Sequence, residues 1–176
     1  MSSIYLRPNS TVSQGMYWVG SYANIDEADP ANDADYCQCT MSSYAYFGLD
    51  DTTETGTISK VTLFYRCWKA GAVINGATAA VGCRIGSTYY GSTYVNLTTT
   101  PTLYSAEYSL DPSTSAIWTF SGVNSLVYQM SLSGYWAFGE DLTYARCSQA
   151  YIRVDYIPSE GATYFLRKLV KVKQIP

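Results

Sequence analysis

The chain contains no histidine among its 176 residues. This absence removes the commonest general base, the commonest metal ligand and every histidine-based catalytic triad. Charged residues make up only 14% of the chain, well below the usual share, and the net charge is −3. A net negative charge argues against a nucleic-acid-binding protein, and no apolar run reaches the length of a membrane span. We therefore expect a protein that is not an enzyme and that has neither nucleic-acid nor membrane partners.

Cysteine is sparse and odd in number. An odd count disfavours a disulfide framework, and Met1–Ile4 is neither basic nor followed by the long apolar run of a secretory signal. Zinc sites built from cysteine alone usually use C-x2-C pairs, and that spacing is absent. We expect reduced, buried thiols and no cofactor. The five cysteines are Cys37, Cys39, Cys67, Cys83 and Cys147.

Tyrosine is abundant, with 18 copies, and together with Thr, Ser and Val it favours strands. The clearest strand is Ala145–Ile157, in which Ala150, Ile152, Val154 and Tyr156 point to one side and polar or aromatic residues point to the other. We expect it to be a central strand with one face in the core. A second strong strand, Ile58–Trp68, carries aromatic residues on both faces, which predicts deep burial on one side and partial cover on the other.

Short strands and turn signals alternate along the rest of the chain. One short helix is expected near residues 119–127, with Thr119 as its N-cap, and Ser87–Ser92 is expected to be a turn. This pattern predicts an all-β fold, an antiparallel two-sheet sandwich that is jelly-roll-like and occupies residues 1–158. The further strands are expected at Ile4–Val12 (an edge strand or leading arm broken by Pro8), Tyr36–Met41, Tyr44–Leu49, Ala79–Ile85, Tyr94–Leu97, Thr102–Leu110 and Val127–Ser133.

The C-terminal segment 159–176 differs from the rest in charge. It has four basic residues against Glu160, a net +3, which leaves −6 for residues 1–158. Apolar and basic residues alternate near its end, which is compatible with a last strand of the same sheet or with an arm that pairs with a neighbouring subunit. We favour the arm, because the sandwich is complete by Tyr156. The expected partner-binding residues are Tyr164, Phe165, Leu166, Arg167, Lys168 and Lys171.

Three groups of residues are weaker candidates for chemistry. An acidic loop is a possible calcium site, although without EF-hand spacing a polar loop with capped turns is the preferred interpretation. Glu140 and Asp141 lie in a turn signal, so a hairpin is preferred over a pair of glycosidase carboxylates. Five aromatic residues are compatible with a sugar-binding platform, and packing in the core is the alternative. The loop residues are Asp26, Glu27, Asp29, Asp33 and Asp35, and the aromatic residues are Trp68, Tyr89, Tyr90, Trp118 and Trp136.

Three segments, Leu6–Cys39, Gly56–Arg66 and Asp111–Tyr156, together resemble a family of small β-sandwich proteins encoded by tailed phages and prophages. The most specific parts are WTFSGVNSL, which begins at Trp118, and QAYIRVDY, which ends at Tyr156. The resemblance implies a jelly-roll-like sandwich and a structural role in the virion, which is assembled in the host cytoplasm. Gly122 departs from the family pattern, which has an acidic residue there, and the segment 159–176 extends past the family's usual end.

We therefore expect a non-enzymatic virion structural protein, such as a capsid decoration (cement) protein or a head–tail accessory subunit. It would act through protein–protein contacts with its own copies, as a homo-oligomer, and with other virion proteins. The alternative is a carbohydrate-binding or adhesin module, whose ligand would be a glycan.

Removing residues 159–176 should leave the sandwich folded and weaken assembly, because the arm contributes contacts between subunits and none to the core. Circular dichroism would report the fold, and analytical ultracentrifugation would report assembly. A truncated chain that unfolds would show instead that the segment is a core strand.

Overall fold

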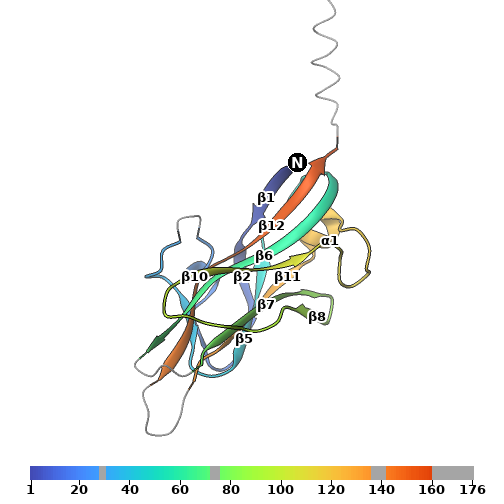
Figure 1. Ribbon diagram of the computed structural model, residues 1–176. Helices are drawn as coiled ribbons and strands as arrows, with labels where there is room; N and C mark the ends of the chain where they lie inside the picture. The colour runs from blue at the N-terminus through green and yellow to red at the C-terminus, as the bar shows by residue number, and fades with distance from the viewer. Residues whose placement is uncertain (28–30, 72–75, 136–141, 160–176) are drawn as a thin grey trace, which may run out of the picture.

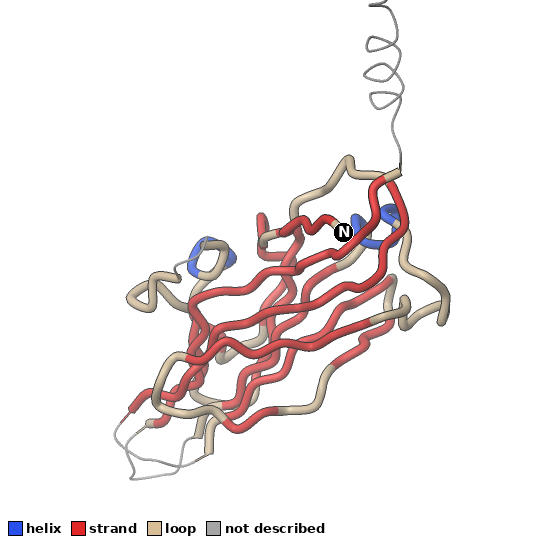
Figure 2. The backbone as a smooth tube through the Cα atoms, turned by 45° about the horizontal axis from the view of Figure 1, so that its top comes forward, coloured by secondary structure: helices blue, strands red, loops and turns tan. Residues whose placement is uncertain are grey.

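The computed structural model describes residues 1–27, 31–71, 76–135 and 142–159. Over these residues the chain is an all-β, jelly-roll-like sandwich of two antiparallel sheets, which confirms the expected fold class (Figures 1 and 2). Within the described residues, no helix is long and apolar enough to cross a membrane.

The first sheet has the strand order β10-β6-β12-β4-β3, and β1 pairs with β12 beside that path. Its longest strands are β6 and β12, with 16 residues each. Figure 1 shows β1, β6 and β12 running side by side towards the end of the molecule where the N-terminus lies. The strands are β1 (Ser2–Leu6), β3 (Trp18–Val19), β4 (Cys37–Cys39), β6 (Gly56–Gly71), β10 (Thr102–Tyr108) and β12 (Thr143–Pro158).

The second sheet has the strand order β2-β5-β11-β7-β8, and β9 also pairs with β7. Two short helical segments lie outside the sheets: the 3-10 helix η1 (Tyr22–Asn24) and the helix α1 (Phe120–Asn124). The strands are β2 (Pro8–Gln14), β5 (Ser43–Leu49), β7 (Thr78–Ile85), β8 (Thr88–Gly91), β9 (Val95–Asn96) and β11 (Val127–Ser133).

The strand β12 is central, as its alternation predicts. It pairs with β6 from end to end on one side, and with β4 and then β1 on the other. Ala150, Ile152 and Val154 are fully buried between the sheets, since each has 0% relative exposure. On β6 the outward-facing Thr62 and Trp68 are buried as well, which confirms that this strand is covered on both faces. The inner residues of β6 and β12 together form the middle of the core.

The helix is confirmed at the expected place. The Thr119 hydroxyl accepts a hydrogen bond from the Gly122 N–H at 3.0 Å, which is the N-cap contact that the sequence predicts. Trp118 is buried under the helix, and its indole N–H donates to the Tyr108 carbonyl at 3.1 Å. Phe120 meets Tyr156 edge-on at 5.3 Å between ring centroids. This ring contact packs the helix against the end of β12.

Two sequence predictions need correction. The expected single segment Ile4–Val12 is two strands in different sheets, because the chain crosses over at Arg7 and Pro8 begins an edge strand, where a missing N–H costs nothing. The expected turn Ser87–Ser92 is wrong, because most of it forms the strand β8. Gly86, with φ of 60°, tightens the hairpin to two residues and leaves the following tyrosines extended.

Replacing Ile152 by Ala should lower the free energy of unfolding by about 2–5 kcal/mol, because the deletion leaves a cavity between the sheets. The matched control is the same change at Ile157 on the same strand, which is 59% exposed and should cost less than about 0.5 kcal/mol. Denaturant unfolding measures both. Equal losses would show that the end of β12 is covered as deeply as its middle.

Candidate functional site

The acidic loop lies against the outer face of the first sheet. The Asp33 carboxylate accepts two hydrogen bonds from the Arg66 guanidinium, at 2.8 and 2.7 Å, and a third from the Ser148 hydroxyl at 2.7 Å. The Gln149 side chain donates to the Glu27 carbonyl, and the Ala150 N–H donates to the Ile25 carbonyl. The loop therefore covers part of β6 and β12 from outside.

The carboxylates of the proposed calcium loop have separate protein partners. Asp33 is held by Arg66, Asp35 accepts a hydrogen bond from the Asn24 amide, and the Glu27 carboxylate accepts one from the Asn32 N–H. No group of three or more metal-ligating side chains comes together in the described part of the chain. Asp29 lies outside the described residues, and Asp26 accepts a hydrogen bond from Arg7 through its backbone carbonyl. A calcium site stays a prediction that these contacts do not support.

The aromatic residues named as a possible sugar platform do not form one together. Trp118 is 3% exposed and belongs to the core, as the core alternative predicts, whereas Trp68 is 6% exposed on the outer face of the first sheet, where Tyr36 packs edge-on against it. Tyr90 packs against the core, and Trp136 lies outside the described residues. Tyr89 is 40% exposed and belongs to a different cluster.

That cluster lies on the outer face of the second sheet, and the strand register defines it. In one row Tyr46 lies opposite Gln129, and Gln129 lies opposite Gly82. The adjacent rows pair Tyr44 with Ser131 and Arg84 with Tyr89. Their chain neighbours Phe47, Cys83 and Tyr128 are fully buried, so these side chains point outward. We call this surface the tyrosine face; it consists of Tyr44, Tyr46, Arg84, Tyr89, Gln129 and Ser131.

Two glycines support the tyrosine face from below. A Cβ atom on Gly82 would lie 2.5 Å from the Tyr89 ring, and one on Gly91 would lie 2.3 Å from the Tyr89 hydroxyl oxygen. The ring therefore lies over the bare backbone of β7 and β8, and any side chain at either glycine would push it away. Glycine at these two positions keeps the tyrosine flat against the sheet.

The polar groups of the tyrosine face are only partly satisfied. The Arg84 guanidinium stacks on Tyr46, 4.8 Å from the ring centroid. Its Nε atom has no hydrogen-bond partner, and neither does the buried Oε1 of Gln129. Burial raises the pKa of Tyr89, helped by its neighbour Tyr94 and opposed by a hydrogen bond with the Ser131 side chain. The face thus combines half-exposed rings with unused donors and acceptors.

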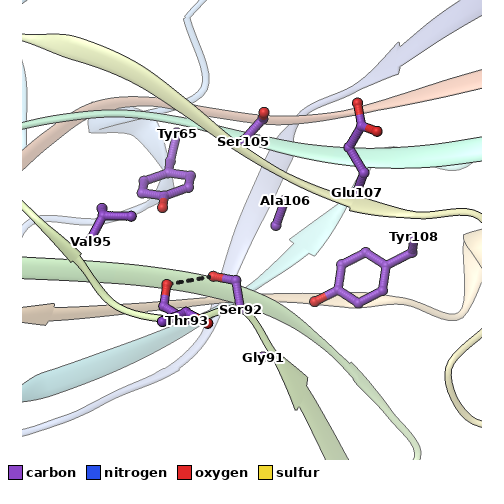
Figure 3. A pocket seen from close by; sticks show the side chains of 9 residues that line it. All are labelled: Tyr65, Gly91, Ser92, Thr93, Val95, Ser105, Ala106, Glu107 and Tyr108. Carbon is purple, nitrogen blue, oxygen red and sulfur yellow. Dashed lines mark hydrogen bonds between the residues drawn. The ribbon is translucent and has the colours of Figure 1, made fainter.

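A groove of about 400 Å³ opens at one side of the sandwich (Figure 3). Residues of β10, from Ser105 to Tyr108, form one wall, and Gly91–Val95 forms the other, with Tyr65 between them. Tyr65 stacks on Tyr104, and the Tyr108 hydroxyl donates to the Tyr90 carbonyl at 3.0 Å. The carboxylate at the groove, Glu107, forms an ion pair with Lys60 at 2.9 Å.

Two buried thiols and two tyrosines of the groove are held in their neutral forms. Burial raises the pKa of Cys39 and of Cys83 to about 12, and it also raises the pKa of Tyr65 and Tyr108 in the groove. All five cysteines are buried and free, as the sequence predicts. None of these shifts lowers the pKa of a thiol or a tyrosine, which is what an activated nucleophile needs.

Several predicted site residues cannot be placed. The six expected partner-binding residues of the C-terminal segment lie outside the described residues, as do Glu140 and Asp141. The residue pattern also does not predict the tyrosine face, apart from Tyr89. The signals available in the sequence were the alternation of Tyr44 and Tyr46 on one strand and the glycine, Gly91, directly after Tyr89-Tyr90. These signals do not suffice to predict the face, because its residues come from four strands, β5, β7, β8 and β11, of which only β7 and β8 are consecutive in the chain.

Replacing Asp33 by Asn should lower stability at neutral pH by about 1 kcal/mol, since the ion pair is partly exposed. The hydrogen-bonded Arg66 holds the pKa of Asp33 below its ordinary value, so the stabilisation is present above the unfolded pKa of about 3.9 and is lost as pH falls through the lower folded pKa. The difference between the two proteins should therefore shrink between pH 5 and pH 2, to be measured by denaturant unfolding.

The exposed loop residue Asp51, replaced by Asn, is the control and should show almost no difference at any pH. A difference between the Asp33 variant and the natural chain that stays constant from pH 7 to pH 2 would contradict a role for the charge.

No protein-family model matches the chain, and no curated protein matches it. Among solved structures, one similar chain is described as "CBM4 structure and function". The two chains are 15% identical, the alignment covers 71% of this chain and 78% of that one, and the TM-score is 0.33. A likeness of this extent carries no argument about ligand or activity. The functional conclusion therefore rests on the surfaces of this chain alone.

Proposed function

We propose that this protein is a non-catalytic binding module whose tyrosine face holds a carbohydrate. One observation carries the proposal: half-exposed tyrosine rings lie on the flat outer face of a sheet beside polar atoms that lack partners. The tyrosines are Tyr44, Tyr46 and Tyr89, and the unpartnered atoms are the Arg84 Nε and the Gln129 Oε1.

The shape of the face suits a sugar ring. The face of a tyrosine ring is the negative side of its quadrupole, and it attracts the slightly positive C–H groups on one side of a pyranose. Tyr89 is held flat over glycine backbone, and Tyr44 meets Tyr46 nearly edge-on at 5.3 Å between centroids. These contacts fix the rings before a ligand arrives, which reduces the entropy lost on binding.

The polar groups favour a hydroxyl-rich ligand over an apolar one. A buried polar atom without a hydrogen bond costs free energy, and a ligand recovers this cost where its binding shifts the side chains that cover the atom. Sugar hydroxyls both donate and accept, so they match an amide oxygen and a guanidinium N–H equally well. Arg84 is the single charged residue of the face, while residues 1–158 carry a net −6. A neutral glycan therefore fits better than a strongly anionic one.

A second candidate function is the virion structural role that the phage resemblance implies, exercised through contacts with other copies and other virion proteins. The edge of β10 that has no strand partner among the described residues favours such contacts. We propose the virion as the setting of the protein on the resemblance alone. Electron microscopy of a particle that carries the tagged protein would test that setting, and a particle without the label would exclude it.

Replacing Tyr44 or Tyr89 by Ala should weaken glycan binding roughly 5- to 10-fold, which corresponds to about 1 kcal/mol of ring stacking. A glycan array would first identify the ligand, and titration calorimetry would then measure each variant. The matched control is Tyr17→Ala, because Tyr17 is 43% exposed but precedes β3 in the other sheet.

Two results would exclude the tyrosine face as the site. One is an array on which the folded protein binds no glycan. The other is a loss of affinity in the Tyr17 variant as large as that in the Tyr44 and Tyr89 variants.

A further inference from the structure

The outer edge of β10 is unprotected. On one side β10 pairs with β6 in continuous register from Thr102 opposite Cys67 to Tyr108 opposite Val61. On its other side it has no strand partner in the described part of the chain. Edge strands are normally blunted by proline, by charged side chains, by bulges or by shortness; β10 has seven residues, no proline and no bulge, and its single charged residue is Glu107. Leu103 on this strand is 45% exposed.

The other edges of the sandwich show the contrast. The strand β2 is also seven residues long, but it begins with Pro8 and its register shifts twice against β5. The edge strands β3 and β9 have two residues each, β8 has four, and β1 has five. Among the described strands, β10 is therefore the longest edge with an unbroken register.

The groove lies directly beside this edge (Figure 3). Its wall is formed by the β10 residues Ser105–Tyr108, and the segment Gly91–Val95 faces them. A strand added to β10 would place alternate side chains in this groove, while its backbone pairs with the unpaired N–H and C=O groups of β10. The backbone bonds would supply affinity, and the groove would supply selectivity.

The chain itself contains a segment with the properties of such a strand. Residues 160–176 follow the end of β12, and apolar and basic residues alternate from Val170 to Lys173. The 17 residues can extend over about 55 Å, whereas a seven-residue strand needs only about 23 Å, so a linker remains. The segment's net charge of +3 complements the net −6 of residues 1–158.

The exit of the chain favours a neighbouring copy over the same one. Val154 of β12 lies opposite Val61, which in turn lies opposite Tyr108, the last residue of β10. The strand β12 then continues for four residues to Pro158, so it ends beyond the end of β10. To pair with its own β10, the segment that follows would have to reverse direction and cross β6.

We propose that residues 160–176 of one copy add a strand to the free edge of β10 in a second copy, with alternate side chains in the groove. This contact joins two different surfaces, so it builds head-to-tail rings or filaments and not an isologous dimer. The segment and the edge together form the assembly interface of the protein.

Cross-linking of full-length chains tests the contact directly. One batch carries Ser105→Cys on β10, and the other carries one introduced cysteine at position 168, 169, 170 or 171 in turn. The native thiols are all buried, so a short bismaleimide links only the introduced pair. We expect a link between the two batches, strongest at alternate positions. The control places the cysteine at exposed Ser10 on β2 instead, and no link should form.

A chain that carries both cysteines separates the two arrangements. At low concentration, a link within a single chain at full yield would overturn the proposal and make the segment a strand of its own sheet. Equal linking to Ser10 and Ser105, or no linking at either, would also overturn it.

Sedimentation of the full chain supplies an independent readout. We expect concentration-dependent association, weakened about 10-fold or more by Glu107→Lys and unchanged by Asp51→Lys, which makes the same charge change on a loop. A synthetic peptide of residues 160–176 should compete and dissociate the assembly. A monomer at every concentration, or an assembly that neither the peptide nor Glu107→Lys affects, would overturn the proposal.

Discussion

The pairing of β12 with β6 is the constraint on which the rest of the structure depends. The two strands are the longest in the chain, and they join from Thr143 to Pro158 with two register shifts. Their inner residues form the middle of the core, and their outer residues are covered in part by the acidic loop. Because β1, β4 and β10 all pair with one or the other, a change in this register would displace every strand of the first sheet.

The two outer faces of the sandwich are finished differently, and this difference locates the candidate site. On the first sheet, Phe64 stacks on Tyr151 at 4.8 Å, and Asp33 from the acidic loop binds Arg66. The chain thus covers much of this face with its own side chains. On the second sheet, no such loop lies over the tyrosine face among the described residues. Polar atoms without partners occur on both outer faces: Thr62 Oγ1 and Arg153 Nε on the first sheet, and Arg84 Nε and Gln129 Oε1 on the second. The less covered face is the one that we propose as the ligand site.

The sequence predicts the parts of this structure that depend on local pattern. Strict alternation identifies Ala145–Ile157 as central, and a single threonine identifies the start of the helix. It does not predict the strand β8, because the pair Tyr89-Tyr90 between glycines and serines has the composition of a turn. It does not predict the tyrosine face either, since its residues come from β5, β7, β8 and β11, and only the register of four strands places them together. Long-range pairing is the information that residue patterns lack.

A binding face and a free edge on one small domain reinforce each other. Stacking on a few tyrosines gives a weak individual contact, because each ring contributes only about 1 kcal/mol. Copies joined through the edge of β10 would present many such faces at once, and the second and later contacts would then be intramolecular, at a high effective concentration. The tyrosine face lies on the second sheet, whereas the free edge of β10 belongs to the first, and Gly91 lies both under Tyr89 and in the groove. In the proposed assembly, a strand added to β10 would leave the outer face of the second sheet open, so a weak site on each copy would suffice for firm attachment by the whole array.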